Sequence, residues 1–189
     1  RFANINAMWN KEEFIKNTSW KETERKINEE TTKLGKHISI LYNKFRSRTP
    51  LASIIDCDNC IFRKIAVLIV ANTVKEEIKN IQSIWPGFYF DKSDKRLPHQ
   101  GKEWHRKMIK SVAQYLTKQG HKLNHEPPLH YGRADIFIED NTKKPTYIEI
   151  GTVGLFKIWY NLMTMPNTTF LLIPNEHIII KLETRPVAK

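Results

Sequence analysis

The sequence predicts an α/β protein in which a largely helical first half precedes a second half of mixed helix and strand patterns. Apolar residues recur at helical spacing through residues 62–85 and again through 103–119. After Gly120 the pattern changes to short apolar runs separated by turn residues, which is typical of strands. A hydrophobic fraction of 40% in 189 residues is enough for a buried core and excludes an intrinsically disordered chain.

The first half predicts four helices. Asn10 and Ser19 are suitable N-caps for the first two, and Gly35 is suited to end the second. A third helix is expected over residues 36–48, and a fourth, longer helix over residues 62–85. This half is therefore expected to be all helical.

The second half predicts the order helix, three strands, helix, two strands. The helices are expected at Glu103–Gln119 and Gly154–Met163, and the strands at Lys122–Glu126, Arg133–Glu139, Thr146–Ile150, Thr169–Ile173 and His177–Leu182. Between the halves, residues 88–100 are polar and rich in turn residues. We therefore expect a helical region at 1–96 and a second domain at 97–189.

The charge of the chain favours a nucleic-acid partner. Its 31 basic and 20 acidic residues give a net charge of +11, which favours nucleic acid over an anionic membrane surface. No apolar run is long enough to span a bilayer, and no G-x-x-x-x-G-K-[ST] loop is present. We therefore expect neither a membrane partner nor a nucleotide cofactor.

Two cysteines exclude a disulfide scaffold and favour an intracellular protein, in the cytoplasm or, for a virus, in the host-cell cytoplasm. Cys57 and Cys60 form a lone C-x-x-C pair, whereas a structural zinc site needs four ligands. A disulfide, half of a site shared between two chains, or two idle thiols remain open.

Two carboxylates interrupt the apolar strands of the second half. Asp135 and Glu149 fall on neighbouring predicted strands, where a buried carboxylate is costly unless it is paired or bound to a cation. Together they could supply oxygen ligands to one Mg²⁺ ion, which would neutralise a phosphate and activate water. The alternative is a pair of structural ion pairs, with Arg133 or Lys122 for Asp135 and with Lys143 or Lys144 for Glu149.

The segment Gly132-Arg133-Ala134-Asp135, followed by a strand containing Glu149 and then a helix, resembles the PD-(D/E)XK nuclease superfamily. Within this superfamily, the Gly-Arg-Ala-Asp motif is most similar to that of archaeal Holliday-junction resolvases and nucleases of archaeal viruses. The resemblance covers residues 101–182 and implies a restriction-endonuclease-like α-β-β-β-α-β core, a mixed sheet flanked by helices. It also implies a homodimeric endonuclease that hydrolyses DNA with Mg²⁺ or Mn²⁺ in recombination, repair, junction resolution or site-specific cleavage.

The resemblance assigns roles to particular residues. Asp135 and Glu149 would be metal ligands, with the carbonyl of Ile150 as a third. Glu126 and Glu103 match positions at which some members add an acidic residue. A solvent-facing strand end is the alternative for Glu126, and favourable placement in the first turn of a helix is the alternative for Glu103.

One position departs from the family pattern. The lysine expected two residues after Glu149 is Gly151 in this chain. Some members supply the lysine from the following helix, which makes Lys157 the candidate for orienting water or stabilising developing charge. The alternatives are a non-catalytic nucleic-acid-binding protein with a degenerate nuclease fold, and a DNA-cleaving subunit of a larger recombination or transposition complex.

Two basic segments are candidates for DNA contacts. Residues 20–48 resemble a helix-turn-helix with its turn at Gly35, although two packed helices without a DNA-reading role would give the same pattern. The expected contacts in this segment are Lys36, His37, Ser39, Tyr42, Asn43, Lys44 and Arg46. In the second half they are Arg106, Lys107, Lys110 and Arg133, whereas we expect His105 on the solvated face of its helix.

Overall fold

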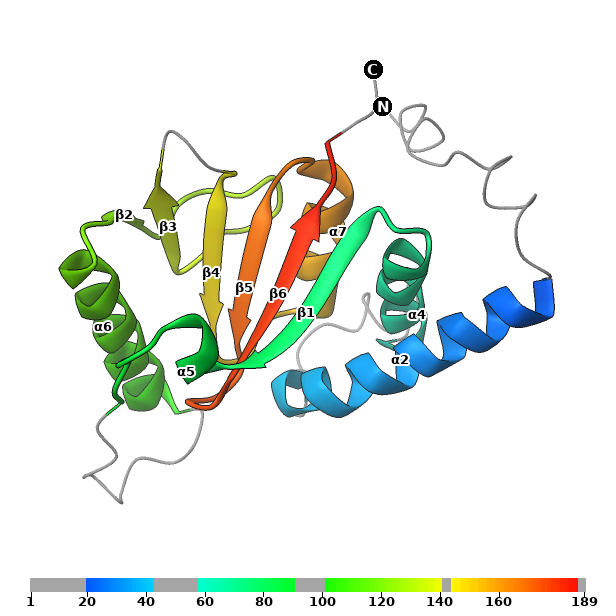
Figure 1. Ribbon diagram of the computed structural model, residues 1–189, viewed down its shortest axis with the longest axis horizontal. Helices are drawn as coiled ribbons and strands as arrows, with labels where there is room; N and C mark the ends of the chain where they lie inside the picture. The colour runs from blue at the N-terminus through cyan, green and yellow to red at the C-terminus, as the bar shows by residue number, and fades with distance from the viewer. Residues whose placement is uncertain (1–19, 43–57, 91–100, 141–143, 187–189) are drawn as a thin grey trace.

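The computed structural model describes residues 20–42, 58–90, 101–140 and 144–186 (Figure 1). Its elements in chain order are α2 (Trp20–Tyr42), α4 (Asp58–Val70), β1 (Val74–Asn80), α5 (Ile81–Ile84), α6 (Lys102–Lys118), β2 (Lys122–His125), β3 (Ile136–Glu139), β4 (Thr146–Ile150), α7 (Leu155–Thr164), β5 (Thr169–Ile173) and β6 (Ile178–Thr184). The α/β class is confirmed.

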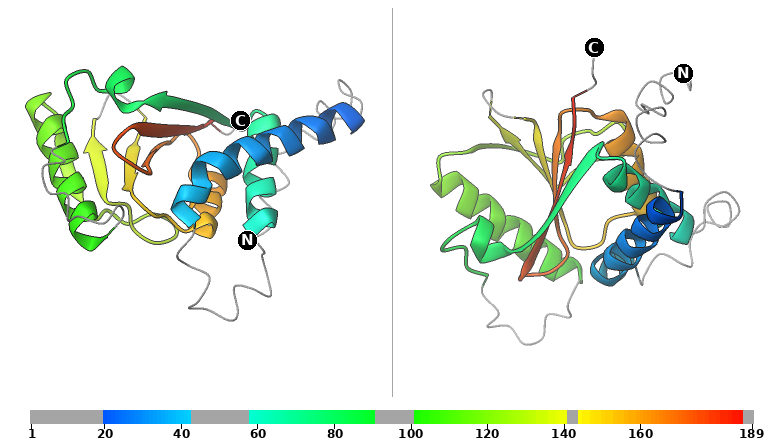
Figure 2. Two further views of the ribbon diagram at one scale, coloured as in Figure 1. Left: turned by 90° about the horizontal axis from the view of Figure 1, so that it is seen from below. Right: turned by 45° about the vertical axis from the view of Figure 1, so that its right-hand side comes forward.

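The strands in the described residues form one six-stranded mixed sheet with the order β1-β6-β5-β4-β3-β2. Strands β4 and β5 are parallel and are joined through α7, whereas the other neighbouring pairs are antiparallel. Helix α6 covers one face of the sheet, and α2, α4 and α7 cover the other (Figure 2). The mixed sheet flanked by helices is therefore confirmed.

Each face of the sheet has its own apolar core because successive strand side chains point to opposite faces. On β5, Leu171 and Ile173 face Met108 and other buried residues of α6. Phe170 and Leu172, which alternate with them, join the core made with α2, α4 and α7. The two cores position α6 and α7 on opposite sides of β4.

The predicted order of elements in the second half is confirmed. The helix, three strands, helix and two strands occur in the expected sequence between Lys102 and Thr184. The largest difference in a boundary is at β3, which begins at Ile136 rather than at Arg133. Residues 126–135 instead form an ordered loop, in which Ala134 N donates to the carbonyl of Pro127 and Leu129 N donates to that of Gly132.

The prediction that the first half is all helical is wrong. Helix α4 ends at Val70, and residues 74–80 form the edge strand β1, which pairs with β6. Val74 and Ile78 are four residues apart, a spacing that gives one face of a helix and also one face of a strand. The first half therefore adds a strand to the same sheet, and residue 96 does not separate a helical region from the sheet.

The helix-turn-helix predicted at residues 20–48 is also wrong in its first part. Helix α2 continues from Trp20 to Tyr42 through Gly35, where the turn was expected. Ile27 and Leu34 are buried in the core that α2 shares with α4, so packing stabilises the helix on the N-terminal side of Gly35. Among the described residues, no helix is both long and apolar enough to cross a membrane.

The expected DNA-reading residues of this segment now divide into two groups. Lys36, His37, Ser39 and Tyr42 lie in the last turns of α2. Asn43, Lys44 and Arg46 lie outside the described residues, as do the expected helix at Asn10 and the cysteine Cys57. A DNA-reading role for the end of α2 stays a prediction, without the turn at Gly35.

The continuity of α2 predicts opposite effects for two Gly→Ala substitutions. Gly35→Ala is expected to raise the free energy of unfolding by about 0.5–1 kcal/mol, because alanine is the better helix former. Gly87→Ala is the matched control, since Gly87 has φ of 77° and open space around it. It is expected to lower the free energy of unfolding by about 1 kcal/mol, because L-residues resist this backbone conformation.

Urea denaturation followed by circular dichroism measures both changes. A loss of stability in Gly35→Ala equal to that in Gly87→Ala would contradict a continuous helix.

Candidate active site

The candidate site begins where β3 and β4 stop pairing through their backbones. Ile136 is the first residue of β3 and lies opposite Ile148. One residue earlier, Asp135 N still donates to the carbonyl of Ile148, at 3.1 Å. The Asp135 side chain then replaces the next backbone partner, because its Oδ2 accepts from Ile150 N at 2.7 Å. The carboxylate is thereby fixed at the end of the β3–β4 ladder.

Glu149 lies next to this point in β4, with only 7% of its side chain exposed. Ile148 and Ile150 face α6, so Glu149 faces α7, where Lys157 Nζ lies 2.6 Å from Glu149 Oε1. Burial raises the pKa of Glu149 to about 7, and the nearby charge of Asp135 contributes in the same direction. The cost of burying this carboxylate therefore exceeds the stabilisation that Lys157 provides.

Lys157 reaches the site from the first turn of α7. Its Nζ also donates a hydrogen bond to the carbonyl of Arg133. The lysine chain passes over Gly132, where an added Cβ would lie 3.4 Å from Lys157 Cε. Gly132 has φ of 82°, so glycine suits both the backbone conformation and the close passage of Lys157. The lysine ammonium thus touches both the strand carboxylate and the loop before β3.

Glycine at position 151 has a local structural reason. Its φ is 75°, a conformation that side-chain-bearing residues rarely adopt. A Cβ at this position would lie 3.3 Å from the Trp104 ring and 3.6 Å from the His105 ring. A lysine would therefore strain the backbone and crowd α6, whereas Lys157 already contacts Glu149 from α7.

His105 was expected on the solvated face of its helix, and this prediction is wrong. Its Nε2 lies 3.3 Å from Asp135 Oδ1 and 3.4 Å from Oδ2. The hydrogen bond to Asp135 raises the pKa of His105, and a backbone hydrogen bond with Ile150 and the charge of Glu149 act in the same direction. A sequence signal existed, since His105 is four residues before Ile109 of the apolar stripe and so borders the packed side of the helix.

The ion pairs proposed as an alternative involve other partners in the structure. Lys122 Nζ lies 2.7 Å from Glu139, and Arg133 lies 3.9 Å from Glu126. Lys143 lies outside the described residues. The partners of Asp135 and Glu149 are His105 and Lys157, which come from helices on opposite faces of the sheet.

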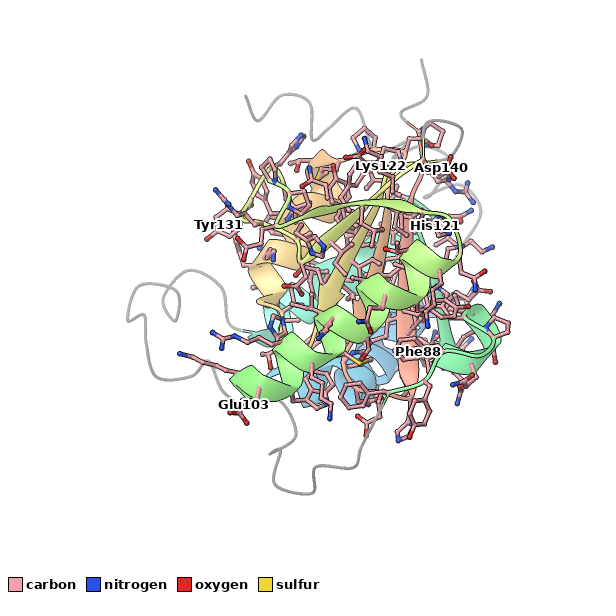
Figure 3. All side chains as sticks on the ribbon, turned by 90° about the vertical axis from the view of Figure 1, so that its left-hand side faces the viewer. Phe88, Glu103, His121, Lys122, Tyr131 and Asp140 are labelled. Atoms are coloured by element: carbon pink, nitrogen blue, oxygen red, sulfur yellow. The ribbon has the colours of Figure 1, made fainter. Side chains whose placement is uncertain are left out.

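The two additional acidic residues do not join this buried group. The Glu126 side chain is 77% exposed, although Glu126 N donates to the Asp135 carbonyl. Glu103 is exposed at the start of α6 (Figure 3). Their proposed contribution to a metal site stays a prediction.

The candidate oxygen ligands for a cation are the carboxylates of Asp135 and Glu149, which pair with His105 and Lys157, and the backbone carbonyl of Ile150. Within the described residues, no group of three or more His, Cys, Asp or Glu side chains is arranged to hold a metal ion. Mg²⁺ commonly takes one or two protein carboxylates and completes its shell with water and phosphate oxygens. The oxygen donors and the net cost of burying Glu149 both fit such an ion.

A basic groove runs along the exposed side of α6, with a volume of about 640 Å³. Its lining is Arg106, Ile109, Lys110, Ala113, Gln114, Thr117, Lys118 and His125. Arg106 directly follows His105, so the groove begins beside the candidate site. Two of the expected DNA contacts, Arg106 and Lys110, line this groove, whereas the Lys107 ammonium lies 5.9 Å from the centre of the Phe90 ring.

Comparisons with known proteins give no match for this chain, whether with family models, curated proteins or solved structures.

The raised pKa of Glu149 predicts the pH dependence of stability without metal. Between pH 4.5 and about 7 the folded protein keeps a proton that the unfolded chain has lost, so stability falls as pH rises through this range. Glu149→Gln removes this loss. At pH 8 in EDTA it is expected to raise the free energy of unfolding by up to about 3 kcal/mol, with little gain below pH 4.5.

Urea denaturation at a series of pH values measures this effect. Glu139→Gln is the matched control because its carboxylate is more exposed and pairs with Lys122 at the edge of the sheet. A Glu149→Gln protein whose stability falls with pH as steeply as that of the natural protein would contradict the prediction.

Proposed function

We propose that the protein is a Mg²⁺-dependent endonuclease that hydrolyses DNA phosphodiester bonds and has the restriction-endonuclease-like core of the PD-(D/E)XK superfamily. One observation carries this proposal: Asp135 and the buried Glu149–Lys157 pair meet at the point where β3 and β4 stop pairing. Two carboxylates can hold a metal ion and a lysine ammonium can stabilise developing negative charge, so the three groups at one strand end suit metal-assisted phosphodiester hydrolysis.

Asp135, Glu149 and the Ile150 carbonyl would hold the ion, either Mg²⁺ or Mn²⁺. When bound, the ion supplies charge neutralisation at the phosphate and lowers the pKa of water. Lys157 then has a second role besides pairing with Glu149, because its ammonium orients the attacking water or stabilises the negative charge that develops on phosphate. His105 positions the Asp135 carboxylate from α6.

The basic groove along α6 supports DNA as the substrate. Arg106, Lys110 and Lys118 line this groove, and Arg106 directly follows His105 in α6. Contacts of this kind bind the phosphate backbone without reading sequence. A homodimer would bring two such sites to the two strands of a duplex, and this arrangement is part of the proposal.

A second function is favoured by two observations. Asp135 already has His105 as a partner, and the motif lysine is replaced by Gly151, as expected for a protein that binds DNA without cutting it. A role as a subunit of a larger recombination or transposition complex is compatible both with DNA cleavage and with DNA binding alone. Cleavage assays separate these functions.

Substitutions in the site are expected to abolish cleavage and to preserve DNA binding. Asp135→Asn removes a metal ligand, and Lys157→Met removes the ammonium, so each should reduce the rate of nicking by at least about 100-fold. Glu139→Gln is the control, since it removes a carboxylate from the far end of β3, where Glu139 pairs with Lys122 outside the site.

Plasmid and branched-DNA nicking with Mg²⁺ or Mn²⁺ measures the rate, and fluorescence anisotropy in EDTA measures binding. Binding without nicking by the natural protein would support the non-catalytic function. Loss of nicking in the Glu139→Gln control would indicate that carboxylates outside the site matter equally.

The groove predicts which lysines determine the salt dependence of DNA affinity. Lys110→Gln combined with Lys118→Gln should weaken binding and reduce the slope of log Kd against log salt concentration by about 1 to 2, since each lost phosphate contact removes about 0.9. Lys79→Gln combined with Lys181→Gln changes the net charge equally on β1 and β6, where both lysines pair with glutamates.

Anisotropy titrations at several salt concentrations give the slope. Equal effects of the two double substitutions would mean that net charge, rather than the groove, determines the affinity.

A further inference from the structure

Four aromatic side chains form a surface cluster next to the candidate site, and we refer to Tyr131, Phe156, Trp159 and Tyr160 as the aromatic platform. Tyr131 is 50% exposed and Phe156 is 37% exposed. The Tyr131 and Phe156 rings meet edge to face with 5.1 Å between their centres, and Tyr160 lies within 6 Å of both. The centres of the Trp159 and Phe156 rings are 5.6 Å apart.

A buried amide holds Tyr131 in place. Asn161 is 1% exposed, and its Oδ1 accepts from Tyr131 N while its Nδ2 donates to the Tyr131 carbonyl, both at 2.9 Å. The same Nδ2 donates to the carbonyl of Lys157. The loop therefore presents the Tyr131 ring from a fixed backbone, which lowers the entropy lost when a ligand binds to the ring.

The aromatic platform is joined to the candidate site through both of its segments. Phe156 directly precedes Lys157, whose ammonium contacts Glu149. Tyr131 is two residues before Arg133, whose carbonyl accepts from Lys157. In Figure 3, Tyr131 lies on the loop before β3, at the periphery of the view that also shows α6. A group stacked on Tyr131 would therefore lie beside the phosphate that Lys157 reaches.

The surroundings of the aromatic platform are positively charged. Arg133 is largely exposed on the same loop, and Lys64 lies over the Trp159 ring, 4.6 Å from its centre. Exposed rings beside cations match the two parts of a nucleotide, a flat base and an anionic phosphate. The bases of intact duplex DNA are stacked inside the helix, so an exposed ring can receive only a base that is unpaired.

We propose that the aromatic platform stacks on an unpaired base next to the cleaved phosphate, so that the substrate is DNA with a branch, gap or single-stranded end rather than intact duplex. This inference rests on the proposed nuclease function and specifies its substrate class. Tyr131 supplies the stacking surface, Asn161 positions Tyr131, and Arg133 faces the adjacent phosphate.

Binding in EDTA tests the stacking without any requirement for cleavage. The probes are a forked DNA with 2-aminopurine at the first unpaired position and an intact duplex of the same length. Tyr131→Ala should weaken fork binding at least about fivefold and restore 2-aminopurine fluorescence, with duplex binding unchanged. Tyr131→Trp should retain both fork affinity and quenching.

Tyr89→Ala is the matched control, since Tyr89 is 76% exposed and lies outside the aromatic platform. Equal affinity of the natural protein for fork and duplex, or equal weakening of both by Tyr131→Ala, would overturn the proposal. A second copy of the chain could cover the aromatic platform instead of a DNA base, and sedimentation velocity tests this alternative. Conversion of a dimer to monomers by Tyr131→Ala would identify the aromatic platform as an interface between two copies and would overturn the proposal.

The two proposals can fail separately. Fork binding that depends on Tyr131 without nicking in Mg²⁺ or Mn²⁺ would retain the stacking and remove the nuclease function. Nicking that depends on Asp135 but does not distinguish forks from duplex would retain the nuclease and remove the stacking.

Discussion

The burial of Glu149 against Lys157 is the interaction on which the arrangement of the candidate site depends. This ion pair connects β4, inside the sheet, to α7 on one face. Among the residues that the structure describes, Lys157 is the cation within 4 Å of the Glu149 carboxylate. A carboxylate removed from water loses more hydration than a single ammonium restores, which accounts for the raised pKa of Glu149. The fold therefore maintains a charge at a cost, a condition common at functional sites.

The loop at residues 126–135 lies between the buried Glu149–Lys157 pair and the molecular surface, because Lys157 also donates to the carbonyl of Arg133 in this loop. Hydrogen bonds across the loop, from Glu126 N to the Asp135 carbonyl and from Ala134 N to the Pro127 carbonyl, extend the β2–β3 pairing beyond the strands. The loop thus presents Tyr131 to solvent at its tip and fixes Asp135 at its base. Surface recognition and the buried carboxylate depend on the same short segment.

Most of the second half could be predicted from sequence, because its helices and strands have different apolar periods and are separated by turns. The expectation that Lys157 reaches the site came from a family resemblance and not from the pattern itself, and its ion pair with Glu149 was not predicted. The strand β1 was missed because Val74 and Ile78 fit a helix equally well, and only pairing with β6 distinguishes the two. The turn expected at Gly35 failed because glycine permits a turn without requiring one.

The role of His105 could not be obtained from its own helix. Its position at the border of the apolar stripe is compatible with solvent or with a contact, and the choice depends on where Asp135 lies. The reason for glycine at position 151 was similarly hidden, since the sequence does not show the Trp104 ring that lies against it. The contacts of such residues depend on which distant segments pack against them, and the pattern of a single sequence does not show this packing.

The pairing of β1 with β6 also has a consequence for biosynthesis. Val74 pairs with Thr184, so more than half of the chain separates the two paired residues. Next to this pair, Arg185 N donates a hydrogen bond to the carbonyl of Thr73. During translation, β1 leaves the ribosome long before its partner exists, and closing so long a loop is entropically slow. Completion of the sheet therefore has to follow synthesis of β6, and until then β1 is an unpaired strand that chaperones or other chains can contact.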